Sequence, residues 1–465
     1  MEQIQERDRD GLNIVKTKYD KERGEDMGSK IKNPPKTWKE KLKIVGPGLV
    51  WAAAAIGSGE LIISSKVGAE YGYLFLWAIW IGIFLKYFIQ RGILDLTVLS
   101  GKPVVELWHK QKFGKLFSIY WLLFFIVTAT GVAGLLGLTA SITHTILPFA
   151  SVNVWAALIV LLVIGIAYTQ KYKSFEKIML ILCGILLIGA IGAVILAQPS
   201  PAEIIKWGIP TTIPAALIFL SLLGWGAGSG PDLMIPYSWW VAEKGYHKLK
   251  VSSDKPLMEN KDKGSIEKIK AWLNVAKIDT MFGYITAGIV ASLFMIAGAA
   301  ILKPRGLVIG GLDVLTKIAE IFTSTYGAWV FIPFLIGAWA AIFSTTLGVF
   351  DGGRVAIAHL SRKLAKREMV PTEKIRTNSW YRTTLILFSL VPLIMFYGFQ
   401  RPVTLVIIAG VVSAISMPLL AFLVYTSLVK QVPKEFRPNK FYLGSLILGI
   451  IVYLGFMVQA LISLF

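Results

Sequence analysis

Two short stretches place glycine and an acidic residue inside long apolar segments. Residues 55–60 read AIGSGE, and residues 227–232 read AGSGPD. Glycine and proline lower helix propensity, so each stretch predicts an unwound turn whose carbonyl oxygens lack their intrahelical donors. A carboxylate in a hydrocarbon environment is costly and marks a functional site by default. Glu60 and Asp232 beside free carbonyls therefore indicate a site for a hard cation, because oxygen donors suit Mg²⁺, Ca²⁺ and Mn²⁺.

The candidate metal ligands are the two acids and the backbone or hydroxyl oxygens of the two turns: Glu60, Asp232, Gly57, Ser58, Gly228 and Ser229. A simpler interpretation stands beside this one. Glycines at short intervals often allow helices to pack closely, and a carboxylate after them often caps the next helical segment. We favour the metal site because two similar motifs occupy matching positions in the chain.

The composition is that of a membrane protein. The chain has 465 residues, of which 55% are hydrophobic and only 16% are charged, and its mean hydropathy is +0.63. A hydrocarbon core of about 30 Å needs roughly 20 apolar residues per spanning helix, and the apolar runs are too long for the roughly ten-residue strands of a membrane barrel. We expect an all-α multi-pass protein with eleven transmembrane helices, near residues 44–65, 73–96, 118–146, 154–169, 177–197, 214–241, 279–302, 327–350, 384–399, 403–429 and 441–464.

Ten of these spans divide into two sets of five, with one broken helix at the start of each set. The first repeat covers 44–197, the second covers 214–429, and 441–464 is an additional helix. Because five spans per repeat force the halves to insert in opposite orientations, the pattern predicts an inverted-repeat transporter that works by alternating access. Residues 1–43 are polar and charged and show no cleavable signal, so we expect a disordered cytoplasmic arm.

The basic residues predict the orientation in the cell membrane. Of the 48 Lys and Arg residues, six fall in predicted external loops: Lys66, Lys206, Lys303, Arg305, Lys317 and Arg401. Lys86 and Arg91 lie within the second span, and the others lie on the opposite side. The positive-inside pattern places the N-terminus in the cytoplasm and the C-terminus outside the cell. Scattered basic residues do not favour nucleic-acid binding.

The sequence offers no pattern of enzyme chemistry. It has no phosphate-binding loop, no histidine-rich ligand cluster and no nucleophile paired with a base. Cys183 is the single cysteine, which excludes an intrachain disulfide and a thiolate cluster. We therefore expect no cofactor, with the metal ion as substrate and the lipid bilayer and the metal as partners of a monomeric protein.

Several segments resemble the Nramp family of divalent-metal transporters. They are GPGLVWAAAAIGSGE and KVGAEYGYLFLW in the first two spans, IDTMFGYITAGIVASLF in the seventh and VVSAISMPLLAFLVY in the tenth. The resemblance covers nearly all of residues 44–464. It implies a LeuT-type core of ten helices in two inverted repeats, with the metal held between the broken first and sixth helices.

Several residues differ from the family pattern, and these differences affect which metal ion we expect the site to bind. Where the family has Asp-Pro-Gly-Asn, this chain has Gly57, Ser58, Gly59 and Glu60, and the Met-Pro-His of the sixth span is missing near Ser229–Asp232. The soft sulfur ligand is therefore replaced by oxygens, which favours Mg²⁺ or Mn²⁺ over iron. In this respect the chain is similar to the Nramp-related magnesium-transporter branch.

Proton coupling in the usual family manner is not expected. The third-span acids of the family are absent from Thr130–Gly134, and Gly410 and Ser416 stand where the tenth span has glutamines. Uptake would then be driven by the membrane potential. Ser416, Thr130 and Thr345 are possible path-lining residues, although hydroxyls in membrane helices usually bond their own backbone.

Two other functions stay open from the sequence. An amino-acid or other organic solute carrier of the same LeuT-type fold would use the free N–H groups of a half-helix to bind a carboxylate. The charge of Glu60 opposes that function because it would repel the substrate. A receptor or sensor that binds metal without moving it would also fit, but such a protein usually carries a sizeable soluble domain.

Overall fold

In the residues that it describes, the structure, a computed structural model, consists of helices, their connections and one β-hairpin. It describes residues 3–7, 13–17, 31–42, 46–57, 59–169, 172–205, 217–245, 256–306 and 326–462, with Leu315, Ala319 and Thr323. A helix lies over each of the eleven predicted spans. The longer helices are α4 (Leu76–Ser100), α6 (Gly114–Ile146), α7 (Val152–Thr169), α8 (Tyr172–Ala197), α12 (Lys263–Ala297), α14 (Phe331–Leu364), α15 (Ser379–Phe399), α16 (Pro402–Lys430) and α17 (Lys440–Ile462).

Shorter elements complete the two interrupted spans and the connections. The first broken helix consists of α2 (Pro47–Ala55), the π-helical turn η2 (Gly59–Ser64) and α3 (Ser65–Tyr71), and the second of α10 (Leu217–Ser221), the π-helical turn η3 (Leu222–Gly226) and α11 (Pro231–Lys244). The connecting elements are α1 (Trp38–Leu42), α5 (Val104–His109), α9 (Pro201–Ile205), η4 (Leu257–Glu259), η5 (Gly298–Leu302), η6 (Lys303–Arg305), η7 (Ala328–Val330), η8 (Thr372–Thr377) and η9 (Lys434–Phe436).

The described helices support a multi-pass membrane protein. Seven of them are long and apolar enough to cross a membrane, and the pair Pro47–Ala55 and Gly59–Tyr71, bent by 42°, makes an eighth. The seven include α4, the first unbroken apolar helix. An apolar helix of fewer residues covers Val152–Tyr168. Eleven crossings stay a prediction.

The N-terminal arm contains regular structure that the sequence did not lead us to expect. β1 (Gln3–Arg7) and β2 (Asn13–Thr17) pair antiparallel, with Gln5 opposite Val15 and Glu6 opposite Ile14. The β-branched residues of β2 favour a strand. The last part of the arm packs on the helical body, because the Trp272 indole of α12 donates a hydrogen bond to the Lys32 carbonyl at 2.9 Å.

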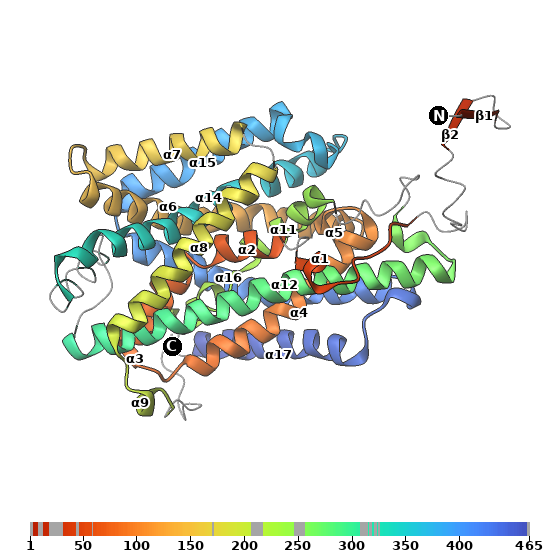
Figure 1. The fold of residues 1–465 in the computed structure, drawn as a ribbon. Coiled ribbons are helices and arrows are strands. Elements are labelled where there is room, and N and C mark those ends of the chain that lie inside the picture. Colours follow the sequence, from red (N-terminus) through yellow and green to blue (C-terminus); the bar gives the residue numbers. More distant parts are fainter. Residues whose placement is uncertain are drawn as a thin grey trace.

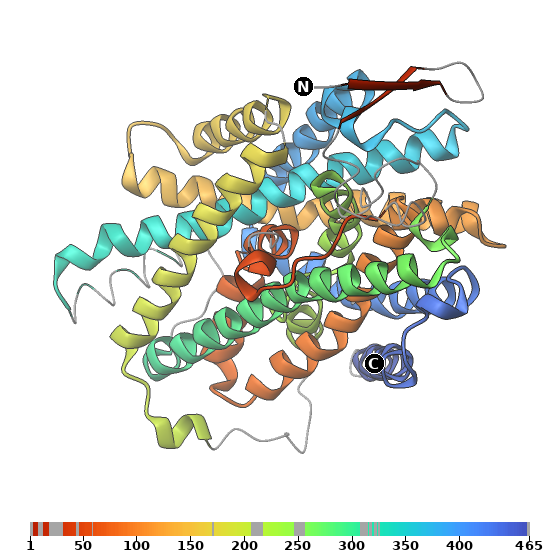
Figure 2. The ribbon, with the colours of Figure 1, turned by 45° about the vertical axis from the view of Figure 1, so that its right-hand side comes forward.

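The two broken helices lie at the centre of the bundle. Figure 1 shows α2 and α11 in the middle, with α4, α12 and α17 along one side and α7 and α15 on the opposite side. The turned view in Figure 2 keeps α17 and α7 on opposite sides of the centre. The long helices therefore form a scaffold that removes both interruptions from solvent.

Asp279 of α12 fixes the start of the first broken helix. Its two carboxylate oxygens accept hydrogen bonds from the Gly46 and Gly48 amides at 2.8 and 2.9 Å. The first amides of a helix have no intrahelical acceptor, so a carboxylate there stabilises the helix end. Pro47, which has no N–H to satisfy, occupies the first helical position.

A buried ion-pair group holds the far end of the second broken helix. This group, here called the Asp351 cluster, consists of Glu243, Asp351, Arg354 and Arg376. Arg376 of η8 donates to both Glu243 oxygens at 2.7 and 2.9 Å and to both Asp351 oxygens at 3.0 Å. Arg354 donates to Asp351 Oδ1 at 2.7 Å. The cluster thereby ties α11 to α14 and η8.

The additional helix α17 also contacts the second broken helix. The Tyr453 hydroxyl donates to the Leu223 carbonyl in η3 at 3.3 Å, and the ring of Phe456 lies 5.2 Å from that of Phe219 in α10. Tyr453 is 2% exposed, so this hydrogen bond is buried. A helix that follows the two repeats thus supports one of the interruptions.

Candidate metal-binding site at the two broken helices

The two interruptions lie against each other. A Cβ atom on Gly59 would stand 1.8 Å from the Trp225 carbonyl oxygen, so only glycine permits this approach of the two backbones. Ser64 Oγ donates to the Gly226 carbonyl at 3.0 Å, and the Gly228 amide donates to Glu60 Oε1 at 3.1 Å. The prediction that both helices break is confirmed in the described residues, and the breaks share one contact surface.

Gly59→Ala tests that contact. The added methyl group meets backbone atoms, which cannot rotate away, so we expect a loss of stability of about 1–3 kcal/mol and a lower thermal midpoint in detergent. Gly449→Ala in α17 is the matched control, because a Cβ there meets nothing within 4 Å. Equal midpoints for the two variants would contradict the packing described here.

Hydroxyl groups of α14 satisfy the polar groups that the first interruption releases. Thr345 Oγ1 accepts a hydrogen bond from the Gly57 amide at 2.7 Å, and Ser344 Oγ donates to the Ala53 carbonyl at 2.7 Å. These hydroxyls replace the intrahelical partners that α2 loses where it ends. Thr345, predicted as a path-lining residue, is fully buried and lies at the first break.

The second interruption runs from η3 to the start of α11. Gly228 has a φ of +77°, a left-handed conformation that favours glycine, and Pro231 starts α11. The freed carbonyls have an unexpected partner: Lys86 Nζ of α4 donates to the Gly224 and Gly228 carbonyls at 2.9 and 2.8 Å. A protein ammonium group therefore contacts two backbone carbonyls within this interruption.

Both predicted acids are buried at the interruptions. Glu60 is 0% and Asp232 is 1% exposed. Asp232 Oδ1 accepts from the Trp225 indole at 2.9 Å and from Ser413 Oγ at 3.3 Å. Among the described residues, Glu60 Oε2 and Ser229 Oγ are buried polar atoms with no hydrogen-bond partner. Buried polar atoms are normally paired, so these two oxygens are available to a ligand.

Three further predicted residues are Ser58, Ser416 and Thr130. Ser58 falls outside the described residues. Ser416 of α16 is buried, bonds the Val412 carbonyl at 2.8 Å and lies 2.8 Å from the Tyr120 hydroxyl of α6. Thr130 donates to the Val127 carbonyl of its own helix at 2.8 Å. Within the described part of the chain, neither hydroxyl is hydrogen-bonded to Glu60 or Asp232, and their role in a path stays a prediction.

The donor set is one of oxygens. No group of three or more His, Cys, Asp and Glu side chains suited to a metal occurs in the described part of the chain. A cation at the breaks would be bound by Glu60, Asp232, backbone carbonyls and the Ser229 hydroxyl. That set suits a hard or borderline divalent cation and offers no soft sulfur ligand.

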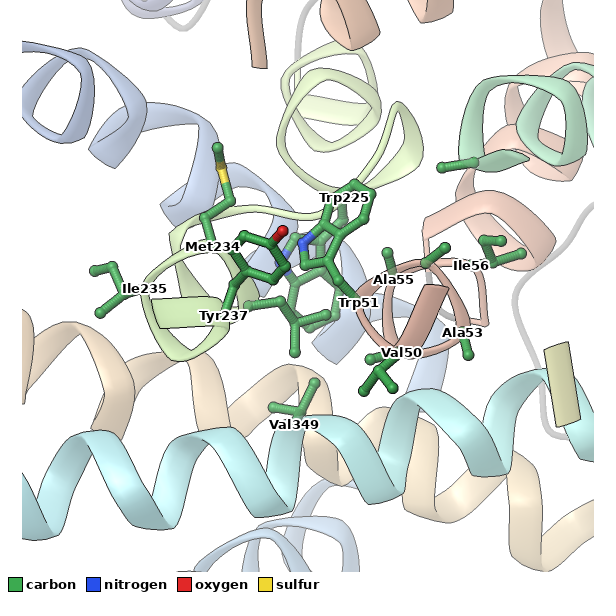
Figure 3. Close-up of a cluster of buried hydrophobic side chains, with 14 of the residues drawn as sticks. Val50, Trp51, Ala53, Ala55, Ile56, Trp225, Met234, Ile235, Tyr237 and Val349 are labelled. Carbon is green, nitrogen blue, oxygen red and sulfur yellow. The ribbon is translucent and has the colours of Figure 1, made fainter. Parts of the chain in front are cut away.

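Aromatic side chains enclose the breaks. Figure 3 shows Trp51 of α2 in one buried cluster with Trp225 and Tyr237 of the second broken helix. The Trp51 ring stacks on that of Tyr284 with centroids 4.1 Å apart, and a Cβ on Gly228 would lie within 3.6 Å of both rings. The site is therefore closed to water from this side, which strengthens electrostatic interactions within it.

Comparison with known proteins now decides the family. The family model described as natural resistance-associated macrophage protein-like matches residues 48–463, which include both broken helices and α17. The chain belongs to the Nramp family. An uncharacterized protein of Pasteurella multocida is 25% identical over 406 residues, covering 83% of this chain and 85% of that protein. The divalent metal cation transporter MntH of Mycobacterium leprae is 23% identical, covering 73% and 77%.

Solved structures agree with the Nramp assignment at the level of fold. The manganese transporter of Eremococcus coleocola superposes with a TM-score of 0.70 at 16% identity, covering 95% of this chain and 90% of that one. MhsT, solved in complex with L-phenylalanine, gives 0.54 at 14% identity, covering 90% and 98%. The predicted LeuT-type helical fold is confirmed, whereas the magnesium-transporter branch stays a prediction for this Nramp protein.

Proposed function

We propose that this chain carries a divalent metal cation, Mg²⁺ or Mn²⁺, across the cell membrane at the contact of its two broken helices. The observation that carries the proposal is the burial of one carboxylate on each broken helix at breaks that share a hydrogen bond. The relatives named as divalent metal and manganese transporters support a metal substrate. The oxygen-only donors support Mg²⁺ or Mn²⁺ rather than iron.

Transport in this proposal proceeds by alternating access and is not coupled to protons in the usual family manner. The segment of α6 beside the second break includes Gly131, where a Cβ would lie 2.2 Å from the Trp225 ring, and α6 has no Asp or Glu along its length. The absence of an acid from this helix supports transport that is not coupled to protons in the usual family manner. The membrane potential then supplies about 2.3 kcal/mol per charge per 100 mV.

The proposal includes the arrangement in the bilayer. We infer a cytoplasmic N-terminus and an extracellular C-terminus, supported by the scarcity of Lys and Arg in the external loops. The monomeric state stays a prediction. The Asp351 cluster and Lys244, whose ammonium group pairs with Glu176 at 2.6 Å, then lie on the cytoplasmic side.

An organic solute carrier is the second candidate, and Lys86 is the observation that favours it. An ammonium group beside the second break would attract a substrate carboxylate, and the fold is shared with MhsT, which was solved with L-phenylalanine. When all three side chains are ionised, the two negative charges of Glu60 and Asp232 exceed the single positive charge of Lys86, which disfavours an anionic substrate group. We therefore rank the metal substrate first.

Uptake into liposomes separates these functions. The purified chain is reconstituted, and entry of Mn²⁺, Mg²⁺, Ca²⁺ and L-phenylalanine is measured with an internal pH indicator. The proposal expects Mn²⁺ or Mg²⁺ entry that an inside-negative potential accelerates and that leaves the internal pH unchanged. Entry of the amino acid without a response to metals would overturn it, and metal entry with acidification would overturn the uncoupled mechanism alone.

A further inference from the structure

The ammonium group of Lys86 lies where a cation bound to the second break would find its backbone ligands. Lys86 projects from the middle of α4 and is fully buried. Its Nζ is within hydrogen-bond distance of two carbonyls four residues apart, that of Gly224 in the π-helical turn η3 and that of Gly228 in the non-helical stretch before α11. Unwinding releases carbonyls of this kind, and they are cation ligands in broken membrane helices.

The same ammonium group interacts with both acids. Glu60 and Asp232 each attract Lys86 electrostatically, and Glu60 also accepts the Gly228 amide whose own carbonyl bonds Lys86. When Lys86, Glu60 and Asp232 are all ionised, the three groups carry one net negative charge instead of the two that the acids alone would carry. A divalent cation would therefore meet weaker attraction, and it would meet a positive charge within a few ångström.

We propose that Lys86 is a tethered cation that competes with the transported ion for the carbonyl oxygens of the second break and for the charge of the two acids. This inference rests on the proposed metal transport and adds its specificity-determining residue. Binding of the ion requires the lysine side chain to leave Gly224 and Gly228. Lys86 thereby weakens binding of the ion and keeps the break satisfied when another cation is not bound there.

A purely structural role makes a different prediction. An ammonium group that only satisfies two buried carbonyls would lower stability when removed and would leave metal affinity unchanged. Stability and affinity must therefore be measured on the same variants. Lys86→Met removes the charge and both donors, whereas Lys86→Gln removes the charge and keeps an amide donor.

The test is a titration of the full-length purified chain in detergent with Mn²⁺ alone, in which calorimetry measures binding. The thermal midpoint of each variant is also recorded with and without Mn²⁺. We expect Lys86→Met and Lys86→Gln to lower the Kd at least about tenfold, as loss of a nearby like charge requires. Mn²⁺ should also raise their midpoints more than that of the wild type. Lys86→Arg, which keeps the charge, should bind no more tightly than the wild type.

Lys66→Met is the matched control, because Lys66 lies in α3 with its side chain paired to Glu70 and its removal changes the net charge equally. Adding Glu60→Gln to Lys86→Met should cancel the gain in Mn²⁺ affinity. Unchanged or weaker binding by both folded Lys86 variants, while the wild type binds Mn²⁺, would overturn the role of Lys86 and leave metal transport standing. Absence of Mn²⁺ binding in the wild type and in every variant would overturn both.

Discussion

Glu60→Gln and Asp232→Asn should each reduce Mn²⁺ uptake in liposomes at least about a hundredfold. Each variant removes one of two carboxylates from a buried site, where the attraction of a divalent ion to a full negative charge is poorly replaced by an amide oxygen. Glu60 also holds the Gly228 amide at 3.1 Å, a bond that a glutamine oxygen can keep. The loss should therefore appear in transport while expression and thermal midpoint change little.

Glu70→Gln serves as the comparison variant for that experiment. Glu70 lies in α3 of the first broken helix, pairs with Lys66 at 2.6 Å and is 32% exposed, so its neutralisation should leave uptake within about twofold of the wild type. Initial rates of Mn²⁺ entry, normalised to reconstituted protein, measure the effect. Normal uptake by both site variants would remove these carboxylates from the metal site.

Arg376→Gln should destabilise the protein by about 3–5 kcal/mol. Removal of one partner of a buried ion-pair network leaves the other charges uncompensated, and Glu243 and Asp351 would lose four charge-assisted hydrogen bonds. Thermal unfolding in detergent, followed by loss of the monodisperse peak, measures the change. Because the Asp351 cluster anchors α11, transport should fall together with stability.

Two further variants test whether Arg376 stabilises the protein through its paired charges. Arg401→Gln neutralises an exposed arginine before α16 and should leave the midpoint unchanged. Combining Arg376→Gln with Glu243→Gln removes one uncompensated carboxylate and should recover part of the lost stability. A double variant no more stable than Arg376→Gln alone would indicate that the cluster does not act through paired charges.

The parts of the fold that follow from the cost of polar groups in hydrocarbon were predictable from the sequence. Long apolar runs require helices, and the described residues of each of the eleven predicted segments contain a helix. Glycine and proline at matching positions predicted both interruptions, and the expense of a buried carboxylate singled out Glu60 and Asp232. Asp351 and Arg354 are three residues apart on one helix, a spacing that favours their ion pair.

Contacts between distant segments were not predictable in the same way. The Gly224 carbonyl and Lys86 are 138 residues apart, and the sequence alone does not give the packing of α4 against η3. The hydrogen bonds from Trp225 and Ser413 to Asp232 were not predictable either, because they depend on how the helices pack. A signal for Lys86 did exist: a lysine in the middle of an apolar span is as costly as the acids.

The hydrogen bond from Tyr453 to the Leu223 carbonyl has a consequence for the energetics of the transport cycle. Two repeats related by a pseudo-twofold axis would exchange shapes when the carrier reorients, and the inward-open and outward-open forms would then have equal free energies. α17 is hydrogen-bonded to one interrupted helix, and the two predicted repeats include no second helix that would bond the other interrupted helix in the same way. In the proposed transport cycle, that one-sided restraint would make the free energies of the two forms unequal, and we expect the resting protein to favour one side of the membrane.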